Sequence, residues 1–368
     1  MFFSKPIYFF KKLKRNILYI SSAHILIYLI LITALFIDIV IKKNLLFIPL
    51  IISTTLTILL LKWGIPKLKK LNLGQVIREE GPKDHFKKSG TPSMGGLLVV
   101  PVGLLIGNLT TMNLKVLIIS ILTIGYMAIG LIDDWKSINL KMNQGLTPKQ
   151  KLFLQALIGS LFIIFSYQKG YLNSYISLWN ENQIELGILI LPIALFILIA
   201  ESNSTNLTDG LDGLASGCSA IIFTGLSILL CLKGNTEGYE LGQFCIALAG
   251  SWIGFLIFNK NPAKIFMGDT GSLSIGATLA GVALLSNSLW SLFLMGGVFL
   301  AEALSVILQV GVFKTTKKVQ GTGYRLFRMA PIHHHLELKG YSEIKIVNSL
   351  WMVTTFFVLL GLILKSKI

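Results

Sequence analysis

Long apolar stretches recur along this chain, and they limit what it can fold into more than any other feature. A helix that crosses the roughly 30 Å hydrocarbon core of a bilayer needs about 20 apolar residues. Runs of this kind lie at 17–41, 45–65, 94–110, 115–132, 150–167, 185–202, 212–233, 242–259, 270–286, 288–313 and 346–365. Backbone polar groups in lipid must be satisfied within their own segment, which favours helices. The sequence therefore predicts an all-α, polytopic transmembrane bundle of about eleven helices.

The charged residues agree with this prediction in both number and placement. Only 14% of the residues are charged, whereas soluble proteins carry about 25%. If the N-terminus lies inside, the inside segments hold 26 of the 33 Lys and Arg residues. Cytoplasmic loops of membrane proteins carry such an excess. We therefore interpret the net charge of +16 as a topology signal and expect no nucleic-acid partner.

Two inside segments near helix ends carry candidate functional groups. The segment 87–96 combines Lys88, Ser93 and glycines at the start of an apolar run, and such helix starts bind anions. Asp133 and Asp134 end another run. Neighbouring side chains on a helix diverge by about 100°, so one carboxylate would face a metal or an acceptor phosphate while the other orients its neighbours.

A third segment, 206–215, contains Asn206, Asp209, Gly210 and Asp212. Polar positions three residues apart share one face of a helix, and glycine lets the backbone approach a ligand closely. The segment contains no basic residue. Its acids therefore predict an external cation or a ligand rich in hydrogen-bond donors.

Two further segments complete the set. In 259–272, Asp269 lies between glycines at a helix start, where a carboxylate can cap amides and hold Mg²⁺, and Phe266 offers an aromatic face to a base. The segment 331–337 contains three consecutive histidines after Arg325 and Arg328. Carboxylates, cations and an aromatic ring together indicate phosphoryl transfer, in which positioning and charge neutralisation dominate. We expect a nucleotide-activated donor and a membrane lipid acceptor.

These five segments, in this order, resemble the polyprenyl-phosphate N-acetylhexosamine-1-phosphate transferase superfamily, a glycosyltransferase 4-type group. Within it they are most similar to the phospho-N-acetylmuramoyl-pentapeptide transferase family. The most discriminating stretches are 90–96, 209–213 and 331–337, and the resemblance extends from about residue 45 to the end.

The resemblance implies a reaction, a cofactor and a location. UDP-N-acetylmuramoyl-pentapeptide and undecaprenyl phosphate would give UMP and the first lipid intermediate of peptidoglycan synthesis, with Mg²⁺ as cofactor. The enzyme would be a multi-pass protein of the bacterial cytoplasmic (inner) membrane, with its active site on the cytoplasmic face. Members of the family also commonly form homodimers.

The resemblance further implies roles for single residues. The predicted catalytic residues are Asp133, Asp134, Asp269 and His333, with Asp133 deprotonating the lipid phosphate. The predicted metal ligands are Asp269 and Asn206. The predicted substrate-binding residues are Lys88, Ser93, Asn206, Asp209, Gly210, Leu211, Asp212, Asn259, Phe266, His334 and His335.

The chain departs from the family pattern in two ways. The family typically has ten helices, so we divide the chain into an N-terminal basic segment with an extra helix, 1–44, and a catalytic bundle, 45–368. Ser93 stands where the family usually has threonine, which preserves the hydroxyl group.

Two alternatives to this interpretation stay open. One is a related enzyme that transfers N-acetylglucosamine-1-phosphate to undecaprenyl phosphate, and the three histidines argue against it. The other is a secondary transporter. Transporters bind their substrates near the middle of the membrane, between internal repeats, whereas the acids of this chain cluster at one face and we find no repeat.

Overall fold

The computed structural model describes residues 21–41, 43, 45–71, 88, 90–140, 145–179 and 182–364. The predicted basic segment 1–16, the first residues of the run 17–41, and Lys87 and Ser89 lie outside these described residues. The long helices are α2 (Ser22–Ile41), α3 (Phe47–Lys70), α4 (Gly96–Thr111), α5 (Leu114–Leu140), α6 (Pro148–Gln168), α7 (Ile190–Thr208), α8 (Leu214–Cys231), α9 (Thr236–Asn259), α10 (Gly268–Leu285), α12 (Gly297–Gln320) and α14 (Glu343–Ile363). The short elements are β1 (Tyr175–Ser177), β2 (Gln183–Glu185), the 3₁₀ turn η3 (Gly187–Leu189), α11 (Leu289–Met295) and α13 (Ile332–Leu338).

The predicted all-α bundle is confirmed, and each apolar run corresponds to a long helix. Within the described residues, nine helices are long and apolar enough to cross a membrane, so the chain is a multi-pass membrane protein. One predicted run, 288–313, is divided into α11 and α12 at Gly296. Paired glycines such as Gly296 and Gly297 are common where helices break, which accounts for the division.

A second boundary also differs from the prediction. Asp133 and Asp134 were expected to end a helix, but α5 continues beyond them to Leu140. Residues 135–140 mix apolar and polar side chains and are compatible with a helix, so the continuous apolar run ends before the helix does.

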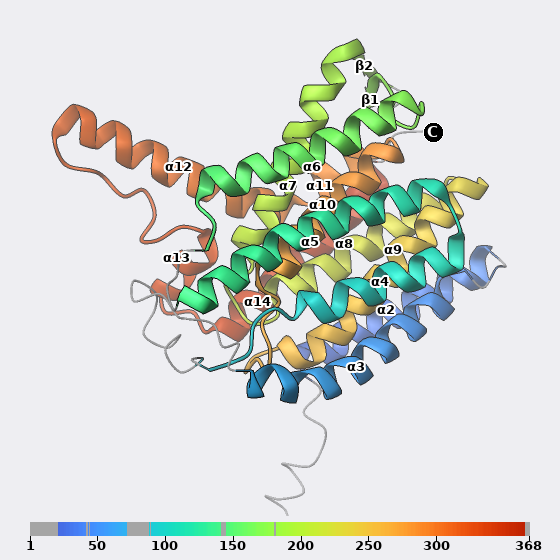
Figure 1. The fold of residues 1–368 in the computed structure, drawn as a ribbon, viewed down its shortest axis with the longest axis horizontal. Coiled ribbons are helices and arrows are strands. Elements are labelled where there is room, and N and C mark those ends of the chain that lie inside the picture. Colours follow the sequence, from blue (N-terminus) through green and yellow to red (C-terminus); the bar gives the residue numbers. More distant parts are fainter. Residues whose placement is uncertain are drawn as a thin grey trace, which may run out of the picture.

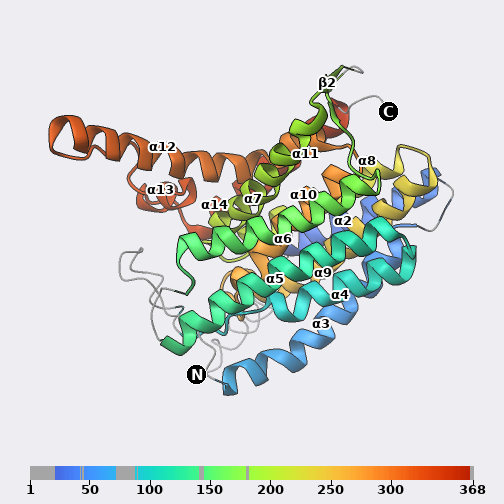
Figure 2. The same ribbon diagram turned by 45° about the horizontal axis from the view of Figure 1, so that its top comes forward.

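Three helices form the interior of the bundle. Nearly all residues of α8 and α10 and most of those of α9 are buried, and the other long helices surround them (Figure 1). Small residues on α9 let it contact α3 closely: the Ser53 hydroxyl donates to the Ala247 carbonyl at 2.6 Å, and Thr54 donates to Gly250 at 3.0 Å. Such small residues are typical of helix contacts in membranes. Helix α12 extends beyond the rest of the bundle in both views (Figures 1 and 2).

The additional N-terminal helix is integrated into the bundle. It packs against α3, α8 and α9. The buried Asp38 carboxylate accepts hydrogen bonds from the backbone N–H groups of Leu45, Leu46 and Phe47 at 2.8–3.2 Å. A carboxylate at these positions satisfies free amides at the start of α3.

Candidate active site

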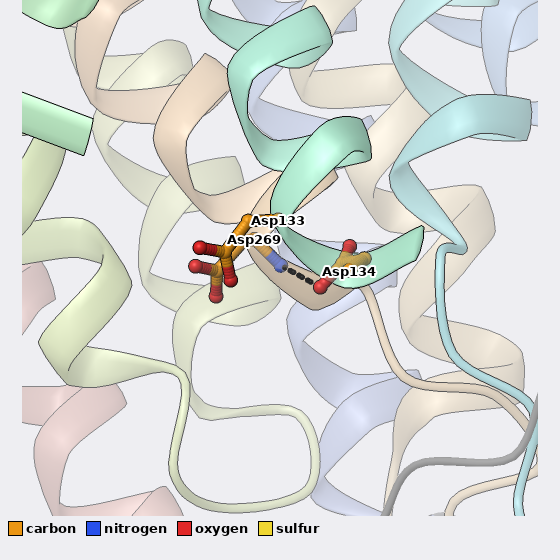
Figure 3. A group of neighbouring side chains, drawn as sticks. All are labelled: Asp133, Asp134 and Asp269. Atoms are coloured by element: carbon orange, nitrogen blue, oxygen red, sulfur yellow. Dashed lines mark hydrogen bonds between the residues drawn. The ribbon is translucent and has the colours of Figure 1, made fainter. Parts of the chain in front are cut away.

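The acidic centre of the site is formed by α5, α6 and α10, which meet at one end of the bundle. Asp133 and Asp269 lie side by side, and Asp134 is turned toward the backbone of α10 (Figure 3). Oxygens of the three carboxylates lie within 4.8 Å of one another. The Lys151 ammonium group lies 3.3 Å from Asp133 Oδ1 and also forms an ion pair with Asp269. Asp133 further accepts a hydrogen bond from the Leu146 N–H at 2.9 Å.

Asp134 has a different set of partners, as expected from the angle between neighbours on a helix. Its carboxylate accepts hydrogen bonds from the Asp269 N–H at 3.1 Å, the Thr270 N–H at 3.0 Å and the Thr270 hydroxyl at 2.6 Å. These donors are among the free groups at the start of α10, where a negative charge is favourable. Asp134 therefore fixes the start of α10 and, with it, the position of Asp269.

Two glycines make this close approach possible. A Cβ atom on Gly130 of α5 would lie 2.2 Å from the Asp269 carbonyl oxygen, so only glycine fits there. Gly268 has a φ of +69°, and a Cβ atom on it would lie 2.3 Å from Asp134 Oδ2 and 3.0 Å from Ser93 Oγ. The buried Ser93 hydroxyl thus lies beside the same turn.

Asn206, at the end of α7, completes this centre. Its side-chain amide donates to Asp269 Oδ1 at 2.7 Å and to Ser272 Oγ at 2.9 Å. The donor set of carboxylate and amide side chains suits a hard cation such as Mg²⁺, and the spacing of the Asp133 and Asp269 oxygens fits a shared ion. In this arrangement the nitrogen of Asn206, and not its oxygen, faces Asp269.

The turn after α7 brings Asp209 and Gly210 to the same end of the bundle. Burial raises the pKa of Asp209 well above its usual range, and repulsion from Asp269, Asp134 and Asp212 adds to the effect. A Cβ atom on Gly210 would lie 2.2 Å from His333 Nε2, so His333 packs directly on this turn.

His333 joins two predicted segments inside the protein. Its imidazole is fully buried, and Nδ1 lies 3.1 Å from the equally buried Glu302 Oε2 on α12. Among the described residues, neither ring nitrogen has a partner with hydrogen-bond geometry. Glu302 was not predicted, because a single acid within an apolar run gives no sign of its partner.

The other two histidines belong to the surface of α13. His334 Nδ1 lies 2.7 Å from Glu337 Oε2. His335 accepts a hydrogen bond from the Arg328 N–H at 3.1 Å, and burial, with Lys339 and Arg328, lowers the pKa of His335. The three consecutive histidines therefore have three different surroundings.

Lys88, Asp212 and Glu343 form a compact charge cluster. The Lys88 ammonium group donates to Asp212 Oδ1 at 2.7 Å and to Glu343 Oε1 at 2.6 Å. Burial opposes the charge of Lys88, but the two carboxylates outweigh it and raise the pKa of Lys88. Asp212 Oδ2 also accepts a hydrogen bond from the Ala263 N–H at 2.9 Å.

The remaining predicted residues hold the loops in place. Buried Asn259 accepts from the Gly213 N–H at 3.1 Å and the Ser216 hydroxyl at 2.8 Å, and it donates to the Ile265 carbonyl at 3.0 Å. Leu211 is buried in the core. Phe266 is half-buried, and its backbone pairs with Pro92 and Gly95.

The structure therefore brings together the acids and amides of three predicted segments, 133–134, 206–215 and 259–272, with Lys88 from a fourth, and it adds Lys151 and Glu343. Lys151 had a detectable signal in the sequence: it lies in the first turn of α6, where a positive charge opposes the helix dipole. Such an unfavourable position indicates a partner. Glu343 gave no comparable signal, because an acid in the first turn of a helix is favourable by itself.

The chain is similar to known proteins over most of its length. A family model described as glycosyl transferase family 4 matches residues 116–287. A phospho-N-acetylmuramoyl-pentapeptide-transferase of Prochlorococcus marinus (strain SARG) is 54% identical over 351 residues, which cover 94% of this chain and 95% of that protein. A protein of the same name from Synechococcus sp. (strain CC9605) is 51% identical over 94% of this chain and 99% of its own length.

A third relative of that name, from Prochlorococcus marinus (strain NATL2A), is 47% identical and covers 99% of this chain and 97% of its own length. A match of that extent includes α2. The residues of the extra helix are thus matched in at least one relative.

Proposed function

Because the chain belongs to the phospho-N-acetylmuramoyl-pentapeptide transferase family, we propose that it transfers phospho-N-acetylmuramoyl-pentapeptide from a UDP-linked donor to undecaprenyl phosphate. The products are UMP and the first lipid intermediate of peptidoglycan synthesis. The observation that carries the proposal is the centre of Asp133, Lys151 and Asp269 at the polar end of a membrane bundle. Such a centre suits transfer between a soluble nucleotide and a lipid.

The reaction exchanges one P–O bond for another. An oxygen of the lipid phosphate attacks the sugar-linked phosphorus of the donor, and the bond from that phosphorus to the bridging oxygen breaks. The bridging oxygen leaves on UMP. A proton carried by the lipid phosphate would pass to the Asp133 carboxylate. The Lys151 ammonium group, 3.3 Å from Asp133 Oδ1, would offset the phosphate charge. Charge neutralisation of this kind is the main contribution of a protein to phosphoryl transfer.

We propose that the metal is Mg²⁺, held by Asp269 with Asn206 and Asp133 beside it. Bound there, Mg²⁺ would neutralise the charge of the donor diphosphate. The proposal is supported by the oxygen-rich donor set and by the separation of the carboxylates. Asp134 fits the role of a positioning group, because α10 amides occupy both of its oxygens.

The predicted substrate-binding residues remain proposals. We assign Asp209 to Asp212 and Asn259 to the nucleoside side of the site, Phe266 to stacking on uracil, and His333 to the phosphates. Lys88 and Ser93 would contact the donor, and His334 and His335 the sugar and peptide. We also propose that the site faces the cytoplasm at the bacterial inner membrane, and that the protein forms a homodimer, which light scattering in detergent would test.

The test is transfer from radiolabelled UDP-N-acetylmuramoyl-pentapeptide to undecaprenyl phosphate by the purified protein. We expect Mg²⁺-dependent lipid product and released UMP, both abolished by EDTA and by Asp269→Ala. Product from UDP-N-acetylglucosamine alone would instead assign the related enzyme. Folded protein that uses neither donor would refute the transferase proposal.

A further inference from the structure

The first residue of α14 connects four segments that are far apart in the sequence. Glu343 Oε1 accepts hydrogen bonds from the Lys88 ammonium group at 2.6 Å and from the Asp212 N–H at 2.7 Å. Its Oε2 accepts from the Asn261 side-chain amide at 2.8 Å. The residues that meet here come from the loop before α4, the turn before α8, the loop before α10 and α14 itself.

Asp212 binds the same partners from the other side. Its Oδ1 accepts from Lys88 at 2.7 Å, and its Oδ2 accepts from Asn261 at 3.2 Å and from the Ala263 N–H at 2.9 Å. Two carboxylates therefore share one ammonium group and one amide. The side chains are only 2–19% exposed, so water offsets little of the repulsion between the two acids.

These contacts fix the loops that carry the proposed donor site. Asp212 lies three residues after Asp209, and Asn261 and Ala263 lie on the segment that leads to Phe266 and Asp269. If the Glu343 charge is removed, Lys88 keeps one carboxylate partner and the turn before α8 loses a strong acceptor for the Asp212 N–H. Hydrogen bonds to charged groups are about twice as strong as neutral ones.

We propose that Glu343 is a positioning residue for the donor site, acting through Lys88, Asp212 and Asn261. This inference rests on the proposed transferase function. The Glu343 side chain holds the nucleotide-binding turn and the loop before α10 in register, and it keeps the Lys88 ammonium group at their junction. The lipid acceptor and the chemical step do not depend on it.

The kinetic test compares Glu343→Gln with the wild-type protein and with Glu185→Gln, a control at an exposed carboxylate on β2. Glutamine keeps the shape of the side chain and can still accept hydrogen bonds. We expect the KM for the UDP-linked donor to rise about tenfold, which corresponds to the loss of one hydrogen bond to a charged group. The kcat and the KM for undecaprenyl phosphate should stay within about twofold of the wild-type values. An equal loss in kcat, or no change in donor KM, would overturn the proposal.

A second measurement does not require enzyme activity. Acetylation of Lys88 by an amine-reactive reagent, followed by mass spectrometry, reports how firmly its ammonium group is held. We expect labelling of Lys88 in Glu343→Gln to be several-fold faster than in the wild type, with the exposed Lys264 as internal reference. Unchanged labelling would refute the proposal that Glu343 holds the Lys88 ammonium group, even if the protein proved to use another donor.

Asn261→Ala covers the case in which Glu343→Gln does not fold. It removes the amide that joins the two carboxylates and keeps the Lys88 ion pairs. We expect about a threefold rise in donor KM, in line with one ordinary hydrogen bond, and little change in Lys88 labelling. A loss of kcat in this variant would count against the proposal, because it would place the junction in the chemical step.

Discussion

The contact of Gly130 with the backbone of α10 gives a sharp test of how the acidic centre is built. A Cβ atom on Gly130 would lie 2.2 Å from the Asp269 carbonyl oxygen, 2.3 Å from its carbonyl carbon and 2.4 Å from the Thr270 nitrogen. All three atoms are backbone, so no side chain can rotate away. In Gly130→Ala, the helices α5 and α10 must therefore separate locally.

The size of this displacement follows from the geometry. Real Cβ atoms essentially never approach such atoms within 3.0 Å, so the closest contact must lengthen by at least about 0.8 Å. The shift falls between Asp133 on α5 and Asp269 on α10. A misplacement of about 1 Å at reacting groups can cost about 100-fold in rate, which is about 2.7 kcal/mol of activation free energy. We expect a loss of that order in kcat/KM for Gly130→Ala.

A matched control lies on the same helix. The three atoms nearest to a Cβ atom on Gly125 would all belong to the side chain of Ile158, with Cγ2 at 2.8 Å, and that side chain can adjust. Transfer rates are measured for both variants at saturating Mg²⁺, together with thermal unfolding in detergent. Gly125→Ala should keep activity within a few-fold of wild type. If Gly130→Ala is equally active, the proposed close contact does not set the position of Asp269.

Three further predictions concern charges around the site. Lys151→Met should lower the transfer rate by about 100-fold or more, as expected when a group that stabilises transition-state charge is lost. The same variant should need a lower Mg²⁺ concentration for half-maximal activity. Lys149→Met should change neither quantity. Burial raises the pKa of Asp209 above the unfolded value of about 3.9, so wild-type stability falls as pH rises above that value. Without Mg²⁺, the melting temperature of Asp209→Asn should therefore rise relative to that of the wild type as the pH increases from about 4. Lys260, next to Asn261 in the loop before α10, donates to the Ser21 hydroxyl just before α2 at 3.1 Å. Lys260→Met should therefore loosen this loop and raise the KM for the donor about threefold, as expected for one lost hydrogen bond. Lys264→Met should leave that KM unchanged.

The sequence was sufficient for the fold because its signal is local. Each apolar run is a property of about twenty consecutive residues, and each one matches a helix of the structure. The break at Gly296 and the continuation of α5 past Asp134 were missed. The break depends on the backbone preferences of two glycines inside the run 288–313. The end of α5 lies where hydrophobicity no longer distinguishes a helix from its surroundings.

The site was only partly predictable, because its contacts are long-range. The predicted acids Asp133 and Asp269 do meet, although they lie far apart in the sequence. The motifs predicted metal or phosphate binding for each segment separately, but not the contact between them. The position of Lys151 in the first turn of α6 indicates a partner but does not identify it, and Glu343 looks like an ordinary charge at a helix start. Their partners follow only from the ion pairs across the bundle, at 3.3 Å from Lys151 to Asp133 and at 2.6 Å from Glu343 to Lys88.

The ammonium group of Lys151 explains how two carboxylates can lie together in a half-buried centre. Unpaired, Asp133 and Asp269 would repel one another strongly where water is scarce. Lys151 is tethered to α6, so its charge stays at the centre whether or not a cation or the donor is bound. A divalent cation bound by Asp269 would neutralise that carboxylate, and Lys151, 3.3 Å from Asp133 Oδ1, would then be available to offset the charge of the phosphates. Removing the lysine should therefore favour the cation and harm the reaction, and an opposite result for either quantity would show that Lys151 serves only to stabilise the fold.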